Sequence, residues 1–169
     1  MDLDRLNREI KCPFTFFHTE DKIGILYKGK EISYIELTEL EDKLFIENAS
    51  TSQEFKQRYL NTCLCYLAAM IAVRKKRILS AVAISPIMLY NMVKLFHCSI
   101  HDEEWNALET PTTNAQCKEY IDKYTYVRIE VHDLVYEDLY QKLLASVEKI
   151  NCTGLGGKRT RRVKKFYYR

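Results

Sequence analysis

Eleven consecutive apolar residues, from Cys63 to Val73, restrict the fold of this chain more than any other feature. Together with the preceding residues they predict a helix over 52–74. The second half of that helix is apolar nearly all round, so it has to be covered on every side. The stretch is far shorter than the roughly 20 residues of a membrane-spanning helix. We therefore predict a buried helix at the centre of the fold.

The N-terminal region predicts strands with one short helix before them. Lys22–Tyr27 and Glu31–Tyr34 are β-rich and flank Lys28-Gly29-Lys30, where glycine supplies the positive φ of a tight hairpin turn. Phe14–His18 is expected to be extended, and Asp2–Ile10 to be helical. These patterns predict an N-terminal β-hairpin.

The segment after the hairpin has helical spacing. Ser33 and Glu36 have the spacing of a capping box, and apolar residues recur from Ile35 to Phe45 at three- and four-residue intervals. We therefore expect a helix that ends near Glu47. A polar loop over 48–52 would then lead into the buried helix.

The second half of the chain predicts mostly helices. Ser85 and Pro86 are a favourable cap and first residue for a helix. The expected elements are helices at 86–96, 102–108 and 113–124, a strand at 124–131 that could join the hairpin, and a last helix that starts after Asp133 and ends before Gly154. The expected fold class is α+β, mostly helical, with an N-terminal β-hairpin, one later strand, a buried central helix and a basic C-terminal tail. We expect a single globular domain over 1–153 and a flexible tail over 154–169.

The charge of the chain is concentrated in this tail. Residues 154–169 hold seven of the 26 basic residues and no acidic residue, which leaves 26 − 7 = 19 basic against 23 acidic residues in the body, a net charge of −4. Such cations neutralise phosphates, and the aromatic rings of 166–168 can stack on unpaired bases. The predicted nucleic-acid-binding residues are Lys158, Arg159, Arg161, Arg162, Lys164, Lys165 and Arg169. A nuclear-import signal, an anionic-membrane contact and a merely solubilising tail use the same charges.

Lys75 and Lys76 belong to a second basic run, at the end of the predicted central helix. Cations at that end complement the helix dipole, which gives the run a structural explanation. We nevertheless include both lysines among the nucleic-acid-binding candidates, because a tail folded back onto them would form one positive surface.

The remaining candidate sites have weaker patterns. His97, Cys98, His101 and Cys117 include zinc-ligand types without paired Cys-x-x-Cys spacing, so no metal site or cofactor is predicted. No catalytic motif occurs, which favours a non-enzymatic protein, and a small enzyme whose site has no recognisable motif stays an open alternative. Trp105, the single tryptophan, is either a ring at the edge of the core or a partner-binding anchor.

These patterns favour a nucleic-acid-associated protein, nuclear or viral, that contacts phosphates through its tail and a protein partner through its helical domain. The N-terminus lacks the apolar run of a signal peptide, so an intracellular protein with reduced cysteines is expected rather than a secreted one. The alternative is an assembly subunit of a larger complex or oligomer, whose tail is an import or acidic-partner docking signal.

Overall fold

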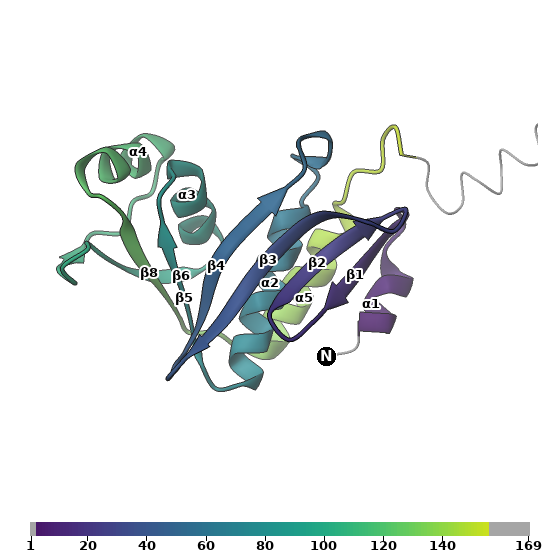
Figure 1. Cartoon of the computed structure of the whole chain (residues 1–169), viewed down its shortest axis with the longest axis horizontal. Coiled ribbons are helices and arrows are strands. Elements are labelled where there is room, and N and C mark those ends of the chain that lie inside the picture. Colours follow the sequence, from purple (N-terminus) through teal and green to yellow (C-terminus); the bar gives the residue numbers. More distant parts are fainter. Residues whose placement is uncertain (1–2, 156–169) are drawn as a thin grey trace, which may run out of the picture. The chain divides into compact units, whose positions relative to one another are not determined.

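The computed structural model describes residues 3–155, which fall into two compact units. Unit 1 comprises 3–36, 48–67 and 137–155, and unit 2 comprises 37–47 and 68–136. Eight strands of the described residues form a mixed sheet in the order β1-β2-β3-β4-β5-β8-β6-β7. Figure 1 labels these strands except β7. Among the described residues, helices account for 38% and strands for 33%, so the prediction of a mostly helical fold is wrong.

An antiparallel meander organises unit 1. Strand β1 (Phe14–His18) pairs with β2 (Lys22–Tyr27), which pairs with β3 (Lys30–Leu40). Tyr27 lies opposite Lys30, and the two residues between them, Lys28 and Gly29, both have positive φ. This geometry is that of a tight hairpin turn, so the predicted N-terminal hairpin is confirmed.

The helix predicted over 35–47 does not exist. These residues form the end of β3 and the start of β4 (Lys43–Thr51), joined by a turn in which Glu41 has positive φ. Ser33, the predicted cap, is buried and its hydroxyl bonds with the hydroxyl of Thr51 at 2.8 Å. The apolar residues of 35–46 fit a two-residue period as well as a helical one, and pairing with neighbouring strands favours the strand.

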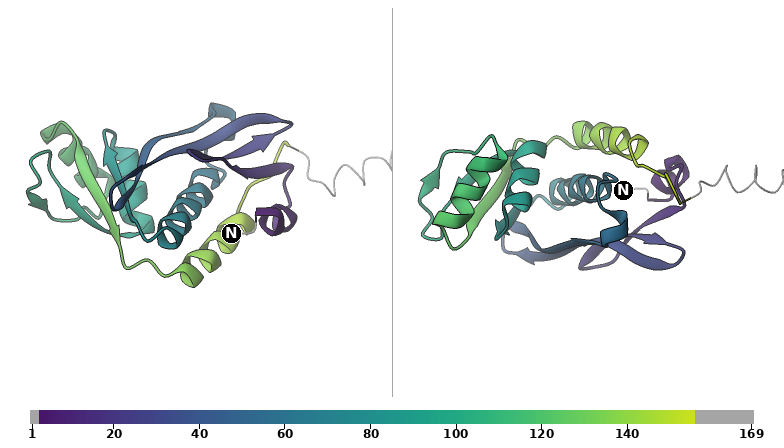
Figure 2. Two further views of the ribbon diagram at one scale, coloured as in Figure 1. Left: turned by 60° about the horizontal axis from the view of Figure 1, so that its bottom comes forward. Right: turned by 90° about the horizontal axis from the view of Figure 1, so that it is seen from above.

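The predicted buried helix is confirmed as α2 (Leu60–Arg74), in which every residue from Cys63 to Ala72 is buried. In unit 1 its first half lies between the strands and α5 (Tyr136–Glu148), as both views of Figure 2 show. Cover from two layers explains why α2 has no polar face. The helix starts later than predicted, because a short 3₁₀ turn (Gln53–Phe55) and two residues with positive φ, Gln57 and Tyr59, precede it.

Helix α1 (Leu3–Glu9) packs beside β1, the strand at one end of the sheet order. The Asn7 side chain accepts a hydrogen bond from the Phe16 N–H at 2.7 Å and donates one to the Phe16 carbonyl at 3.1 Å. It therefore satisfies the backbone groups that a further strand would otherwise take.

Unit 2 contains a split β-α-β arrangement. Strand β5 (Ile78–Ala83) runs parallel to β4, and β8 (Val127–His132) lies antiparallel between β5 and β6 (His97–His101). The 124–131 strand was therefore predicted correctly in type, but the expectation that it joins the N-terminal hairpin is wrong. It alternates as expected, with Val127, Ile129 and Val131 buried.

Helix α3 (Pro86–Leu95) packs against β5, β6, β8 and α4 (Asn114–Lys123). The Ser85 hydroxyl accepts a hydrogen bond from the Met88 N–H, and that of Thr113 accepts one from the Gln116 N–H, which confirms both predicted helix starts. The helix predicted over 102–108 is wrong, since this segment is a turn that leads into the short strand β7 (Ala107–Leu108). None of the helices in the described part of the chain is both long and apolar enough to cross a membrane.

Candidate nucleic-acid interface

The predicted nucleic-acid-binding residues of the tail, 158–169, lie outside the described residues. The segment from which the tail departs, 150–155, is described, and we call residues 150–153 the tail root. It follows α5 in unit 1, and Gly154 beyond it has a φ of 81°. The contacts of the tail root define where the seven cations are attached.

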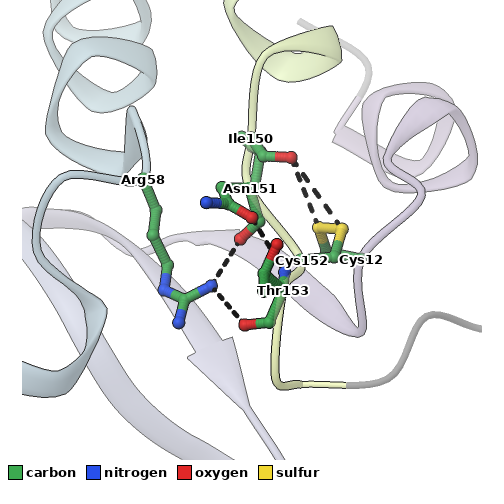
Figure 3. Close-up of a disulfide and its surroundings, with 6 residues drawn as sticks. All are labelled: Cys12, Arg58, Ile150, Asn151, Cys152 and Thr153. Carbon is green, nitrogen blue, oxygen red and sulfur yellow. Dashed lines mark hydrogen bonds between the residues drawn. A yellow bond between two sulfur atoms is a disulfide. The ribbon is translucent and has the colours of Figure 1, made fainter.

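Arg58 holds the tail root from the segment just before α2. Its guanidinium Nη1 donates hydrogen bonds to the carbonyl of Asn151 at 2.7 Å and to the carbonyl of Thr153 at 3.1 Å (Figure 3). The Asn151 side chain in turn accepts from the Thr153 N–H at 2.8 Å. A charged donor shared by two carbonyls fixes the backbone more firmly than neutral bonds do. No sequence pattern indicated this role for Arg58.

A disulfide between Cys12 and Cys152 holds the tail root from the other side (Figure 3). The Cα atoms are 5.4 Å apart, within the range that a disulfide requires. The pairing contradicts the expectation that all cysteines are reduced, which rested on the lack of a signal-peptide pattern. No local spacing indicates the bond either, because 140 residues separate the two cysteines. The bond ties the segment between α1 and β1 to the segment after α5.

The Ile150 carbonyl oxygen lies 3.7 Å from Cys12 Sγ and 3.9 Å from Cys152 Sγ. A disulfide sulfur carries no proton, so neither contact is a hydrogen bond while the bond is intact. In the reduced state both thiols would have this acceptor within reach.

The first turn of α2 adds positive potential near Arg58. The backbone N–H groups at the start of a helix have no acceptor within it, and the helix dipole is positive at that end. Lys56, exposed, lies in the same connecting segment. Glu54, also exposed, lies two residues before Lys56, so the segment carries charges of both signs.

Lys75 and Lys76 lie in unit 2, just after the last turn of α2. Lys75 forms an ion pair with Glu39, and this hydrogen bond and charge lower the pKa of Glu39. Lys76 is exposed in a turn and has a φ of 55°. These contacts agree with the structural explanation of the basic run. The tail itself is not described, so the proposed joint positive surface stays a prediction.

Trp105 is half-exposed, in the turn after β6. The centre of its ring lies 4.4 Å from Arg128 Cζ and 4.5 Å from Lys43 Nζ. Both distances are within the range of cation–π attraction. The structure therefore places two cations beside the predicted partner anchor, and neither cation was among the predicted site residues.

The four cysteines outside the disulfide are buried. Burial raises the pKa of Cys63, Cys65 and Cys98 to about 12, so these thiols stay protonated at neutral pH. Within residues 3–155, no three His, Cys, Asp or Glu side chains lie close enough together to hold a metal ion. His97 Nδ1 and Asp133 Oδ2 are 2.5 Å apart, but both side chains are highly exposed.

Comparison with known proteins finds no relative of this chain. No protein-family model matches the chain, and neither the curated proteins nor the solved structures contain a match.

Proposed function

We propose that the chain is a nucleic-acid-associated protein that contacts phosphates through its basic tail. The observation that carries the proposal is the attachment of seven cations, with no intervening acid, to a tail root held by Arg58 and by the Cys12–Cys152 disulfide. A fixed root lowers the chain entropy lost when the tail is ordered on a partner. The acidic body, with a net charge of −4, leaves the tail as the main attraction for polyanions.

The test compares the full-length chain with a variant in which all seven tail cations are glutamine. Their replacement changes the formal net charge from +3 to −4 without changing the length. Binding of labelled DNA and RNA is followed by fluorescence anisotropy over a salt series. If all seven cations contact phosphates, the slope of log K against log salt is about −6 for duplex DNA and about −5 for a single strand.

Two outcomes contradict the proposal. One is binding that does not depend on salt, and the other is equal affinity of the two proteins. The matched control exchanges each tail lysine for arginine and each tail arginine for lysine. This variant keeps the charge and should keep the slope of log K against log salt.

A second candidate, an assembly subunit, is favoured by two exposed apolar side chains at the start of α3. Ile84 and Ile87 are 74% and 72% exposed. Large apolar side chains that are this exposed are typical of partner contacts when they cluster. Sedimentation of the full-length chain tests this alternative, because self-association that Ile87→Ser abolishes would support it and a monomer at all concentrations would oppose it.

A further inference from the structure

The strands of unit 2 present two different faces. On β8, Val127, Ile129 and Val131 are buried, whereas Arg128 and Glu130 between them are only half-buried. Helix α3 packs against β5, β6 and β8, and its own Leu89 and Met92 are buried. The apolar side chains thus form the face that the helix covers. Arg128 and Glu130 point to the opposite face.

Trp105 lies on this opposite face and is held by a tightly bonded turn. The Asp102 carboxylate accepts hydrogen bonds from the N–H groups of Glu104 and Asn106 and from the Asn106 side chain, at 3.0, 2.8 and 3.0 Å. Desolvation raises the pKa of Asp102, but these bonds outweigh it and hold that pKa below its usual value. The turn places Trp105 at a φ of 66°. The residue is 48% exposed, and its ring lies beside Lys43 and Arg128.

Unbonded polar atoms gather on the same face. Four buried side-chain nitrogen or oxygen atoms in the described residues have no hydrogen-bond partner, and three of them are Ser80 Oγ, His101 Nδ1 and Arg128 Nε. Arg128 lies opposite His101 in the β6–β8 pair, and Ser80 lies opposite Glu130 in the β5–β8 pair. Buried polar atoms are nearly always bonded, so these neighbouring unbonded ones need partners from outside the described residues, supplied by water or by a ligand.

The charges on this face have both signs, and one cation has no acidic partner among the described residues. Glu130 is already paired with Lys43 at 3.3 Å, across the intervening strand β5. Arg128 forms no ion pair with any described residue, and it donates to the Glu103 carbonyl and to the Tyr126 hydroxyl. The guanidinium charge is therefore not neutralised within the described part of the chain, and it lies next to an exposed aromatic ring.

We propose that this face, defined by Lys43, Ser80, His101, Trp105 and Arg128, binds single-stranded nucleic acid. A base stacks on the exposed part of the Trp105 ring, and the backbone phosphates pair with Arg128 and Lys43. Rotation of the indole gives the ligand access to Arg128 Nε and the Ser80 hydroxyl. The assignment rests on the proposed function and gives it a strand type, because the bases of a duplex are already stacked on one another and cannot stack on a side chain.

An acidic peptide would pair with the same cations, but it would leave the exposed ring without a stacking partner. An open sheet face that combines aromatic and basic side chains is the arrangement by which proteins splay and stack unpaired bases. Nucleic acid therefore accounts for the ring, the cations and the unbonded donors together, whereas an acidic peptide accounts for the cations and the donors but not for the ring.

The experiment uses the variant with seven tail glutamines, in which the tail no longer contributes binding. Because Trp105 is the only tryptophan, its fluorescence reports this face alone. The probes are an oligothymidylate of about 15 nucleotides, which covers the sites of typical single-strand binders, the corresponding duplex and an oligoglutamate. We expect the single strand to quench the fluorescence, and the duplex and the oligoglutamate to leave it unchanged.

Substitutions then assign the contact to the ring. Anisotropy with labelled oligothymidylate should show about a tenfold loss of affinity for Trp105→Ala. Tyr34→Ala is the matched control, because Tyr34 is a strand residue of unit 1 with Lys22 Nζ 4.8 Å from its ring centre, and its loss should leave the affinity unchanged. Arg128→Gln should weaken binding and reduce the slope of log K against log salt by the amount that about one phosphate contact contributes.

The outcomes separate the two proposals. Tail-dependent binding by the full-length chain, without any quenching of Trp105, would keep the proposed function and overturn the single-strand face. Quenching by oligoglutamate instead of oligothymidylate would assign the face to an acidic protein partner and overturn the nucleic-acid assignment. Quenching by the single strand together with equal affinity of the full-length chain and the variant with seven tail glutamines would keep the face and overturn the role of the tail.

Discussion

The two units differ in how they satisfy their polar groups. In unit 1, Asn7 bonds both backbone groups of Phe16, and Arg58 bonds two carbonyls of the tail root. The buried Ser33 hydroxyl in unit 1 is bonded, whereas the buried Ser80 hydroxyl in unit 2 is not. Unit 1 is thus closed by its own contacts, and unit 2 keeps unbonded donors on one face. The difference supports the proposals that unit 1 anchors the tail root and that unit 2 offers a binding surface.

The largest expected effect on stability comes from removing the disulfide of unit 1. Replacing Cys12 and Cys152 together with serine should lower the free energy of unfolding by roughly 2–5 kcal/mol, because the disulfide closes a loop through most of the chain. Denaturant unfolding measures the change.

A reductant supplies the control for this prediction. Dithiothreitol should bring the unaltered chain to the stability of the double-serine variant and leave that variant unchanged. Equal stability of the oxidised chain and the variant would show that the closure of unit 1 does not depend on the disulfide.

The next largest effect is expected at the β1 edge of unit 1. Asn7→Ala removes both hydrogen bonds to Phe16 and should cost about 1–2 kcal/mol. It also frees the β1 edge for pairing with another chain, so light scattering should rise with concentration. Asn48→Ala is the control, since its amide only donates to the Tyr34 hydroxyl at 3.4 Å on the surface. No change in either measurement would show that Asn7 does not protect the edge.

A matched pair of serines compares the units directly. Ser33→Ala should cost about 1 kcal/mol, because it removes the partner of the Thr51 hydroxyl. Ser80→Ala should be neutral or slightly stabilising, because it removes a buried hydroxyl that has no partner. Urea unfolding of the two variants provides the measurement. A larger loss for Ser80→Ala than for Ser33→Ala would reverse the contrast between the units.

The smallest effect concerns the Glu39–Lys75 ion pair of unit 2. The pKa of Glu39 is lowered in the folded state, so its contribution is present above the unfolded pKa of about 4.5 and is lost as the pH falls through the lower folded value. Lys75→Gln should therefore reduce the stability slightly at pH 7 and not at all at low pH. Thermal unfolding at both pH values checks this, and an equal loss at both would assign the effect to packing.

Local chemistry determined the parts of the fold that the sequence predicted. Gly29 marks its turn, Ser85 caps its helix, and the apolar run from Cys63 to Val73 has to be buried wherever it lies. The failures came from segments whose conformation depends on distant partners. Residues 35–46 have a pattern that fits helix or strand, and only pairing with β2 and β5 decides between them.

The candidate site followed the same division. The sequence shows the positive charge of the tail and shows that Trp105 is the single tryptophan, so both were predicted as functional features. Arg58, Cys152 and the cations beside Trp105 were missed, because each acquires its role from a residue far away in the chain. Arg128, for instance, approaches Trp105 only because β6 and β8 are paired.

The carbonyl of Ile150 affects what happens when the disulfide is opened. Reduction creates two new S–H donors, and an oxygen already lies within reach of both. These donors are weak, and in the chain-entropy account the stability penalty of reduction comes from the conformational freedom that the unfolded chain regains. An entropic penalty grows in proportion to absolute temperature, so the reduced and oxidised chains should differ more in stability when warm than when cold.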